Sequence, residues 1–261
     1  MRGALTDREA IAHLRDVIHV LVRRDFRSRY KHTSIGIVWS VLNPLFFLLI
    51  FYTVFAHGLD LLDTPRLSGI FIGILTWQWV QAALNQAASS ITGNANLVGQ
   101  PGFPVEALPI ISTIMAMVNF LIALPLLAVF IAFEGIGLSW TVLWLPVIIA
   151  VQFALILSVS YFIAAVNVVF RDVEQSLPII LQLGYFVTPI FYEFGSLKGG
   201  IKALVNANPV THLVEAYRSV LLRQEGPDVG LLAVILIVSL VLLFLAFTYF
   251  RSARLRFLEE L

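Results

Sequence analysis

The sequence lacks cysteine and is poor in charge. No cysteine occurs among its 261 residues, which excludes disulfides and thiolate metal sites. Only 13% of the residues are charged and 59% are hydrophobic, whereas about a quarter of the residues in a soluble domain are charged. The three lysines lie outside any glycine-rich loop of the kind that cradles ATP phosphates. These deficits exclude a soluble globular enzyme, a disordered chain and a protein that binds nucleic acid.

The few charges are also unevenly placed. Of 33 charged residues, twelve lie in residues 1–31 and five in residues 251–261. Between them, six stretches free of Asp, Glu, Lys and Arg are long enough to span a bilayer, which takes about 20 mostly apolar residues. We place six transmembrane helices at 36–57, 67–91, 107–133, 141–169, 175–192 and 229–250. The predicted fold is therefore an all-α integral membrane protein.

Positive charge sets the expected orientation. Residues 1–35 carry eight Lys and Arg residues, and the positive-inside rule places such a segment in the cytoplasm. An even number of spans then puts both termini in the cytoplasm, and we see no secretory signal peptide before the first span. The predicted organisation is an interface segment at 1–35, one transmembrane domain at 36–250 and a cytoplasmic tail at 251–261.

The segment before the first span has a pattern of its own. Thr6 and Glu9 have the spacing of a capping box, and apolar residues then recur every three or four positions, namely Ile11, Leu14, Ile18, Leu21 and Val22. This periodicity predicts an amphipathic helix of about 18 residues that lies in the membrane interface plane. Its function stays open between a membrane anchor and a docking surface for a partner protein.

A cationic ridge follows, formed by Arg24, Arg27 and Lys31 with Tyr30 beside them. Two interpretations remain for it. It is the ordinary positive flank of a span, which binds anionic lipid headgroups, or it holds the phosphate of a lipid-linked substrate.

No ionisable residue lies in the middle of a predicted span. Ion- and proton-coupled transporters place such groups there, and a membrane-embedded enzyme needs a cluster of acids or histidines. The sequence has neither, so a transport function would need energy from another subunit.

Three polar segments remain as functional candidates. Segment 93–104 carries Leu97, Val98 and Phe103 as apolar anchors, and is either a turn or a plug for a groove on a partner. Segment 193–227 is too apolar for a free loop and too short for two spans, which predicts half-inserted helices on the outer side. The aromatic set around Tyr185 and Phe186 suits either a lipid interface or stacking on sugars.

These segments, in this order, resemble the membrane subunit of type-2 ABC exporters for polysaccharides, the family that exports O-antigen, capsule and teichoic acid. The resemblance rests on residues 24–31 (RDFRSRYK), 34–45 (SIGIVWSVLNPL), 96–98 with 103–104, 167–173 (NVVFRDV), 188–192 (TPIFY) and 208–210 (NPV). One departure is segment 99–102 (GQPG), where the resemblance leads us to expect basic residues.

The resemblance implies a homodimer that forms a continuous channel for a lipid-linked polysaccharide, with two copies of a separate ATPase that bind ATP and Mg²⁺; this chain itself would hold no cofactor and no metal. It implies coupling to the ATPase by Leu97, Val98, Gly99, Phe103 and Pro104, and substrate headgroup binding by Arg24, Arg27, Tyr30 and Lys31. The implied channel aromatics are Trp39, Phe46, Tyr52, Tyr185, Phe186 and Tyr192. The implied outer gate is Thr188, Pro189, Asn208, Pro209, His212 and Tyr217.

The resemblance thus predicts a transporter subunit in the inner membrane of a bacterium. Two other functions stay open at this point: a type-2 permease for a small lipophilic drug or lipid, and a membrane scaffold that only recruits partners.

Overall fold

The structure is a computed structural model that describes residues 7–31, 38–53, 66–137, 139–192 and 199–260. Within these ranges the chain is helical and contains no strand. The α-helices are α1 (Asp7–Lys31), α2 (Val38–Tyr52), α3 (Leu67–Ala88), α4 (Ala95–Val98), α5 (Ala107–Phe133), α6 (Leu145–Val169), α7 (Asp172–Val187), α8 (Gly199–Ala207), α9 (Pro209–Arg218) and α10 (Val229–Glu260). Short 3-10 turns precede α4 and α6, and a π-helical turn, Ser219–Arg223, follows α9.

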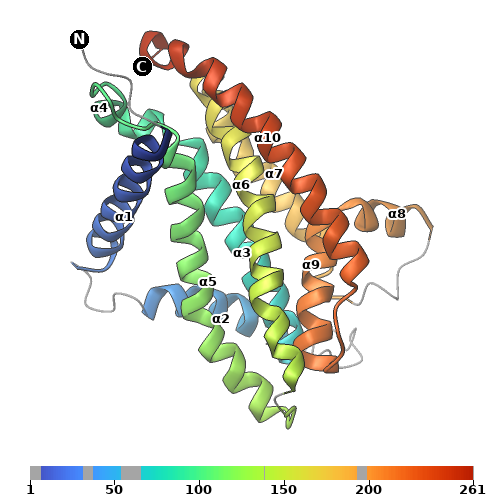
Figure 1. Ribbon diagram of the computed structural model, residues 1–261. Helices are drawn as coiled ribbons and strands as arrows, with labels where there is room; N and C mark the ends of the chain where they lie inside the picture. Colours follow the sequence, from blue (N-terminus) through green and yellow to red (C-terminus); the bar gives the residue numbers. More distant parts are fainter. Residues whose placement is uncertain (1–6, 32–37, 54–65, 138, 193–198, 261) are drawn as a thin grey trace.

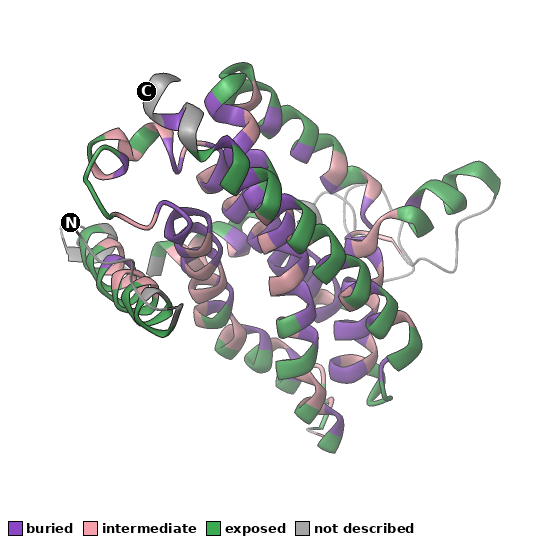
Figure 2. Ribbon diagram, turned by 45° about the horizontal axis from the view of Figure 1, so that its top comes forward, coloured by how far each residue is buried: buried purple, intermediate pink, exposed green. Residues whose placement is uncertain are grey.

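Four long helices, α3, α5, α6 and α10, form the body of the molecule (Figure 1). Each is long and apolar enough to cross a membrane, which confirms the predicted apolar helices at 67–91, 107–133, 141–169 and 229–250. The α3 helix is the most enclosed, since it packs against α2, α5, α6, α7 and α9. Figure 2 shows buried residues on the inward faces of the bundle and exposed residues on its outward faces.

The helices observed within the predicted spans 36–57 and 175–192 are shorter than those spans. The α2 helix has 15 residues and α7 has 16, below the roughly 20 that a span needs. The α7 helix ends at Val187 because Pro189 cannot continue it and disfavours helical geometry at Thr188. In Figure 1, α2 runs crosswise to the long helices. The described part of the chain therefore contains four helices of spanning length rather than six.

The amphipathic N-terminal helix is confirmed, but it is longer than predicted. It has 25 residues, and its apolar side packs on α5. Leu21 is buried there against Ala107, Ile111 and Met115, whereas Ile11, expected on the same face, is 66% exposed. Because its apolar side has a protein partner, α1 runs alongside the first half of α5 and not across the end of the bundle (Figure 1).

The start of α1, the α4 segment and the end of α10 lie together at one end of the bundle, which we call the terminal end (Figure 1). The turn after α5 and the turn after α9 lie at the opposite end. The predicted tail at 251–261 is a continuation of α10 as far as Glu260. It stays helical because Phe250 and Phe257, two turns apart, are both fully buried against the bundle.

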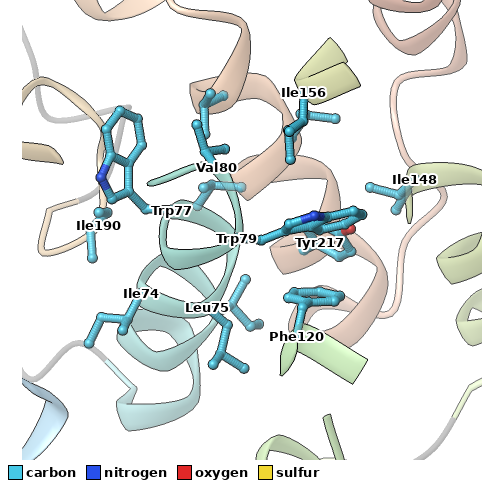
Figure 3. Close-up of a cluster of buried hydrophobic side chains, with 14 of the residues drawn as sticks. Ile74, Leu75, Trp77, Trp79, Val80, Phe120, Ile148, Ile156, Ile190 and Tyr217 are labelled. Atoms are coloured by element: carbon cyan, nitrogen blue, oxygen red, sulfur yellow. The ribbon is translucent and has the colours of Figure 1, made fainter. Parts of the chain in front are cut away.

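The core is aromatic at its centre. Trp79, Phe120 and Tyr217 come from α3, α5 and α9 and gather in one cluster (Figure 3). The Phe120 ring packs at a tilt against both of the others, with centroids 5.1 Å from Trp79 and 5.8 Å from Tyr217. Trp79 is buried in the middle of α3. Trp77 is buried on another side of α3, against Gly184 of α7. A Cβ on Gly184 would lie 2.6 Å from the Trp77 ring, so this helix contact requires glycine.

Candidate functional site

A cavity of about 440 Å³ lies between α2, α3, α5 and α7; we call it the chamber. Fifteen residues line it, and among them is no Asp, Glu, Lys, Arg or His. Six are amides, namely Asn43, Gln78, Gln81, Asn85, Asn119 and Gln182, and five are aromatic, namely Trp39, Phe47, Trp79, Phe120 and Tyr185. The chamber is therefore uncharged and combines amides with aromatic rings, and it is open on the side where Asn43 and Gln182 are exposed.

Helical spacing explains how the amides come together. Gln78, Gln81 and Asn85 recur at intervals of three and four on α3, so they share one face. Asn119 enters from α5, where it accepts a hydrogen bond from the Ser40 hydroxyl of α2 at 3.4 Å. Asn85 also buries its Oδ1 atom without a hydrogen-bond partner among the described residues. The sequence reasoning missed these amides because it searched the spans for charge only; a search for Asn and Gln at helical spacing finds them.

The predicted channel aromatics separate into groups. Trp39 and Tyr185 line the chamber. Phe46 and Phe186 are exposed on α2 and α7 and do not line it. Tyr192 folds back on the end of α7, where its hydroxyl donates to the Val187 carbonyl at 2.9 Å. The side chain of Tyr52 lies outside the described residues.

At the opposite end, Arg218 links three segments of the chain. Its guanidinium donates to the Gly69 carbonyl of α3 at 3.2 and 3.1 Å and to the Ile190 carbonyl at 2.9 Å. It also pairs with Glu215, three residues earlier in the chain, at 3.0 Å. Glu215 in turn contacts Arg223. The network joins α3, α9 and the turn after α7, and its two carbonyl contacts could not be predicted from the sequence.

The predicted gate residues belong partly to this region. Asn208 caps α9 by accepting from the Val210 amide at 3.0 Å, and it donates to the Thr188 hydroxyl at 2.9 Å. The two Pro-containing motifs, with Pro189 and Pro209, are thereby joined. His212 contacts the Asn206 carbonyl at 2.8 Å.

Tyr217 does not face an outer mouth. It is 1% exposed, and its hydroxyl donates to Oε1 of Gln152 at 2.9 Å, while Nε2 of Gln152 donates to the Thr76 carbonyl at 3.0 Å. This chain of bonds holds α9 against α6 and α3. Tyr217 is therefore a core residue that holds the α9 helix of segment 193–227 against the bundle.

At the terminal end, the predicted coupling segment is folded onto the bundle. Val98 is only 6% exposed, in a cluster with Ile91, Val105 and Leu108. Leu97 and Phe103 are half-buried against the cluster between α1 and α5. The expectation of three exposed apolar anchors is therefore wrong for Val98. Pro104 is half-buried, and the exposed part is the turn Gly99–Gly102.

A basic residue does lie beside this segment, but it comes from α10. Arg254 pairs with Glu106 at 3.1 Å and donates to the Phe103 carbonyl at 3.3 Å. The Tyr161 hydroxyl of α6 donates to the Glu106 carbonyl at 2.8 Å. The end of α10 thus fixes the junction between the coupling segment and α5, which the sequence could not show because Arg254 is 148 residues from Glu106.

Comparison with known proteins decides the class of this molecule. The family described as ABC-2 type transporter matches residues 16–222. This chain belongs to the ABC-2 type transporter family. It is 30% identical to an O-antigen export system permease protein, RfbA, of Myxococcus xanthus, over 95% of this chain and 96% of the relative.

Two further relatives support the assignment. An RfbA permease of Klebsiella pneumoniae is 25% identical over 96% of this chain and 97% of its own length. The polysialic acid transport protein KpsM of Escherichia coli is 22% identical over 90% of this chain and 92% of its own length. The resemblance inferred from the motifs is thus confirmed: this ABC-2 chain is homologous to permeases of polysaccharide export.

One of the motifs has a structural role in this ABC-2 chain. Asn167, in the NVVFRDV run, is fully buried, and its side chain donates to the Ala88 carbonyl at the end of α3 at 2.8 Å. The same side chain accepts from the Glu174 amide in the first turn of α7 at 2.9 Å. One residue therefore joins the ends of α3 and α6 to the start of α7.

The structure describes only part of the cationic ridge of this ABC-2 chain. Arg24 pairs with Asp25 at 2.9 Å, and both line a second cavity of about 240 Å³ with Gln86, Ser89 and Ser90 of the α3 end. Arg27 is exposed. The side chains of Tyr30 and Lys31 lie outside the described residues. Among the described residues, no group of His, Asp and Glu is arranged to hold a metal ion.

Proposed function

We propose that this chain is the membrane subunit of an ATP-driven exporter that moves a lipid-linked polysaccharide across the cytoplasmic membrane of a bacterium. A homodimer would form the channel, and two copies of a separate ATPase would bind ATP and Mg²⁺. The observation that carries the proposal is the uncharged chamber of amides and aromatic rings in an ABC-2 chain. Amides bond sugar hydroxyls and aromatic rings cover the apolar faces of sugars.

Exposed amides on α2 and α7 support the homodimer. Asn43 and Gln182 are both exposed in the structure of one chain, and lipid tails cannot satisfy their hydrogen bonds. A second copy, or the water-filled channel that two copies enclose, can. Exposed Trp39, Phe46 and Phe186 belong to the same helices and would let a sugar chain slide past.

The two ends then face different compartments. The terminal end would be cytoplasmic, where the exposed side of α1 and the turn Gly99–Gly102 contact the ATPase. Arg24 and Arg27 would bind membrane headgroups or the phosphate of the arriving substrate. The opposite end, with Thr188 and the α8 and α9 helices, would form the outer gate.

The polar chamber also separates the remaining alternatives. A permease for a lipophilic drug requires an apolar binding site, and a scaffold requires no internal cavity. Six amides in one cavity favour a hydroxyl-rich substrate over both.

The direct test is deletion of this chain's gene in its own bacterium. We expect surface polysaccharide to disappear and lipid-linked polymer to accumulate inside, as followed by surface labelling and by extraction of the lipid fraction. The wild-type chain should restore export. Unchanged surface polysaccharide after deletion would refute the proposal.

Orientation can be tested cleanly because the chain has no cysteine. Gln100→Cys and Gly200→Cys each place one thiol at an exposed position, at the coupling turn and at the start of α8. An impermeant thiol reagent should label the second variant in intact cells and the first only after lysis. The reverse pattern would overturn the assigned sides.

A further inference from the structure

We propose that the chamber selects uncharged glycosyl units and rejects acidic ones. This rests on the proposed function, because it assigns the class of sugar to the site that the polysaccharide would pass. The polymer would be built of neutral hexoses or N-acetylated sugars, and units with a carboxylate would be disfavoured at this point of the path.

The first reason is the bonding capacity of the lining. Each Asn or Gln offers one carbonyl oxygen as acceptor and one NH₂ group with two donors. Hydroxyl and acetamido groups also both donate and accept, so six amides match them without any charge. A carboxylate only accepts, so it would leave the amide carbonyl oxygens without donors.

The second reason is electrostatic. A charged group that gives up water when it enters the chamber needs an opposite charge, or it carries a desolvation cost. No Lys, Arg or His lines the chamber among the described residues. Two arginines of the described bundle are engaged elsewhere: Arg218 with carbonyls and Glu215 at the opposite end, and Arg254 with Glu106 at the terminal end.

The third reason is the shape of the site. A volume of about 440 Å³ falls in the range of small-molecule sites, about 300–1,000 Å³. Trp79 packs on Phe120 and Phe120 on Tyr217 in tilted pairs (Figure 3), so that Trp79 and Phe120 give the chamber a closely packed aromatic wall. Trp39 is 52% exposed and can cover a sugar that enters from the side of α2.

The test compares two probes of similar length, a neutral tetramer of N-acetylglucosamine and the acidic tetramer of galacturonic acid. The full chain is purified in a detergent without a sugar headgroup, because such a headgroup would compete for the chamber. Binding is followed by tryptophan fluorescence, since Trp39 and Trp79 line the chamber. We expect saturable binding of the neutral probe and at least about tenfold weaker binding of the acidic one, a difference of roughly 1.4 kcal/mol.

A charge substitution makes the test specific to the chamber. Gln78→Lys should raise the affinity for the acidic probe about tenfold and leave the neutral probe bound no more tightly than before. Gln100→Lys adds the same charge at the exposed coupling turn and should change neither affinity. If Gln78→Lys does not fold, Gln81→Lys, one turn further along the same helix face, replaces it.

Equal binding of the two probes, binding of neither, or equal effects of the two lysine variants would each overturn the selectivity. These outcomes are distinct from failure of the proposed function, which the gene deletion reports. Export that is lost on deletion, together with no preference in the chamber, would refute the selectivity alone.

Discussion

Two arginines hold the two ends of this bundle, and they differ in how much water reaches them. Arg218 and Arg254 each bind a backbone carbonyl and a carboxylate. The side chain of Arg218 is 11% exposed and that of Arg254 is 44% exposed. Breaking a buried pair strands its partners, whereas an exposed pair contributes little. The opposite end is therefore fixed by directional bonds, while the terminal end can rearrange at much lower cost.

The packing around the two arginines agrees with this difference. At the opposite end, Asn208, Thr188, Tyr217 and Gln152 form further buried polar bonds. At the terminal end, apart from a few hydrogen bonds, the coupling segment is held mainly by apolar contacts of Val98 and Phe103. Apolar contacts are non-directional, so the side chains of Val98 and Phe103 can shift against their neighbours without losing directional bonds of their own. A segment that transmits the movement of a partner requires this property.

The largest effect is expected from Arg218→Met. Methionine keeps most of the volume but removes all the donors, so the carbonyls of Gly69 and Ile190 and the Glu215 carboxylate lose their partner. We expect a loss of about 3–5 kcal/mol in the free energy of unfolding. Reversible denaturation of the purified chain, followed by circular dichroism, measures it.

Arg223→Met is the matched control, because Arg223 contacts the same carboxylate but its side chain is 51% exposed. Its removal should cost no more than about 1 kcal/mol. Similar losses of stability for the two variants would show that burial does not distinguish these arginines. That result would contradict the contrast between the two ends.

An intermediate effect is expected from Val98→Ala at the terminal end. The substitution removes two buried carbon atoms from the cluster with Ile91 and Leu108, at about 0.8 kcal/mol each. The expected loss is about 2 kcal/mol, measured by the same denaturation. Asn96→Ala, an exposed position in the same short helix, should leave stability unchanged. A Val98 variant as stable as the wild type would mean that this segment is not packed as described.

The contrast between the ends also explains what the sequence could predict. Charge-free apolar runs identified α3, α5, α6 and α10, since a long apolar helix has few alternatives. Leu213, Ala216, Tyr217 and Val220 recur at helical spacing, and all four are buried. Such periodicity shows that a face is apolar, but not whether lipid or protein covers it.

The chamber and the arginine contacts could not be predicted from the sequence, for another reason. Gln78 and Gln182 meet only because α3 and α7 pack together, more than one hundred residues apart in the chain. Arg254 reaches the Phe103 carbonyl only because α10 stays helical past its apolar run. Both depend on the arrangement of helices in space, which the pattern within one helix does not contain. The uncharged turn Gly99–Gly102 suggested that the coupling segment lacked a basic residue, whereas α10 brings one to it.

The smallest effect is expected from Arg254→Ala. Water reaches the Arg254 side of the lost pair, although the Glu106 side chain is only 12% exposed, so the free energy of unfolding should fall by about 1 kcal/mol, the upper end for an exposed pair. A double-mutant cycle with Glu106→Gln isolates the interaction from other effects of each substitution, and we expect a coupling energy of about 0.2–1 kcal/mol. A coupling energy near 3 kcal/mol would show that Arg254 stabilises its end about as strongly as Arg218 does, which would contradict the contrast between the ends. A small value keeps the terminal end as the one where a partner can move α10 and the coupling segment apart at little energetic cost.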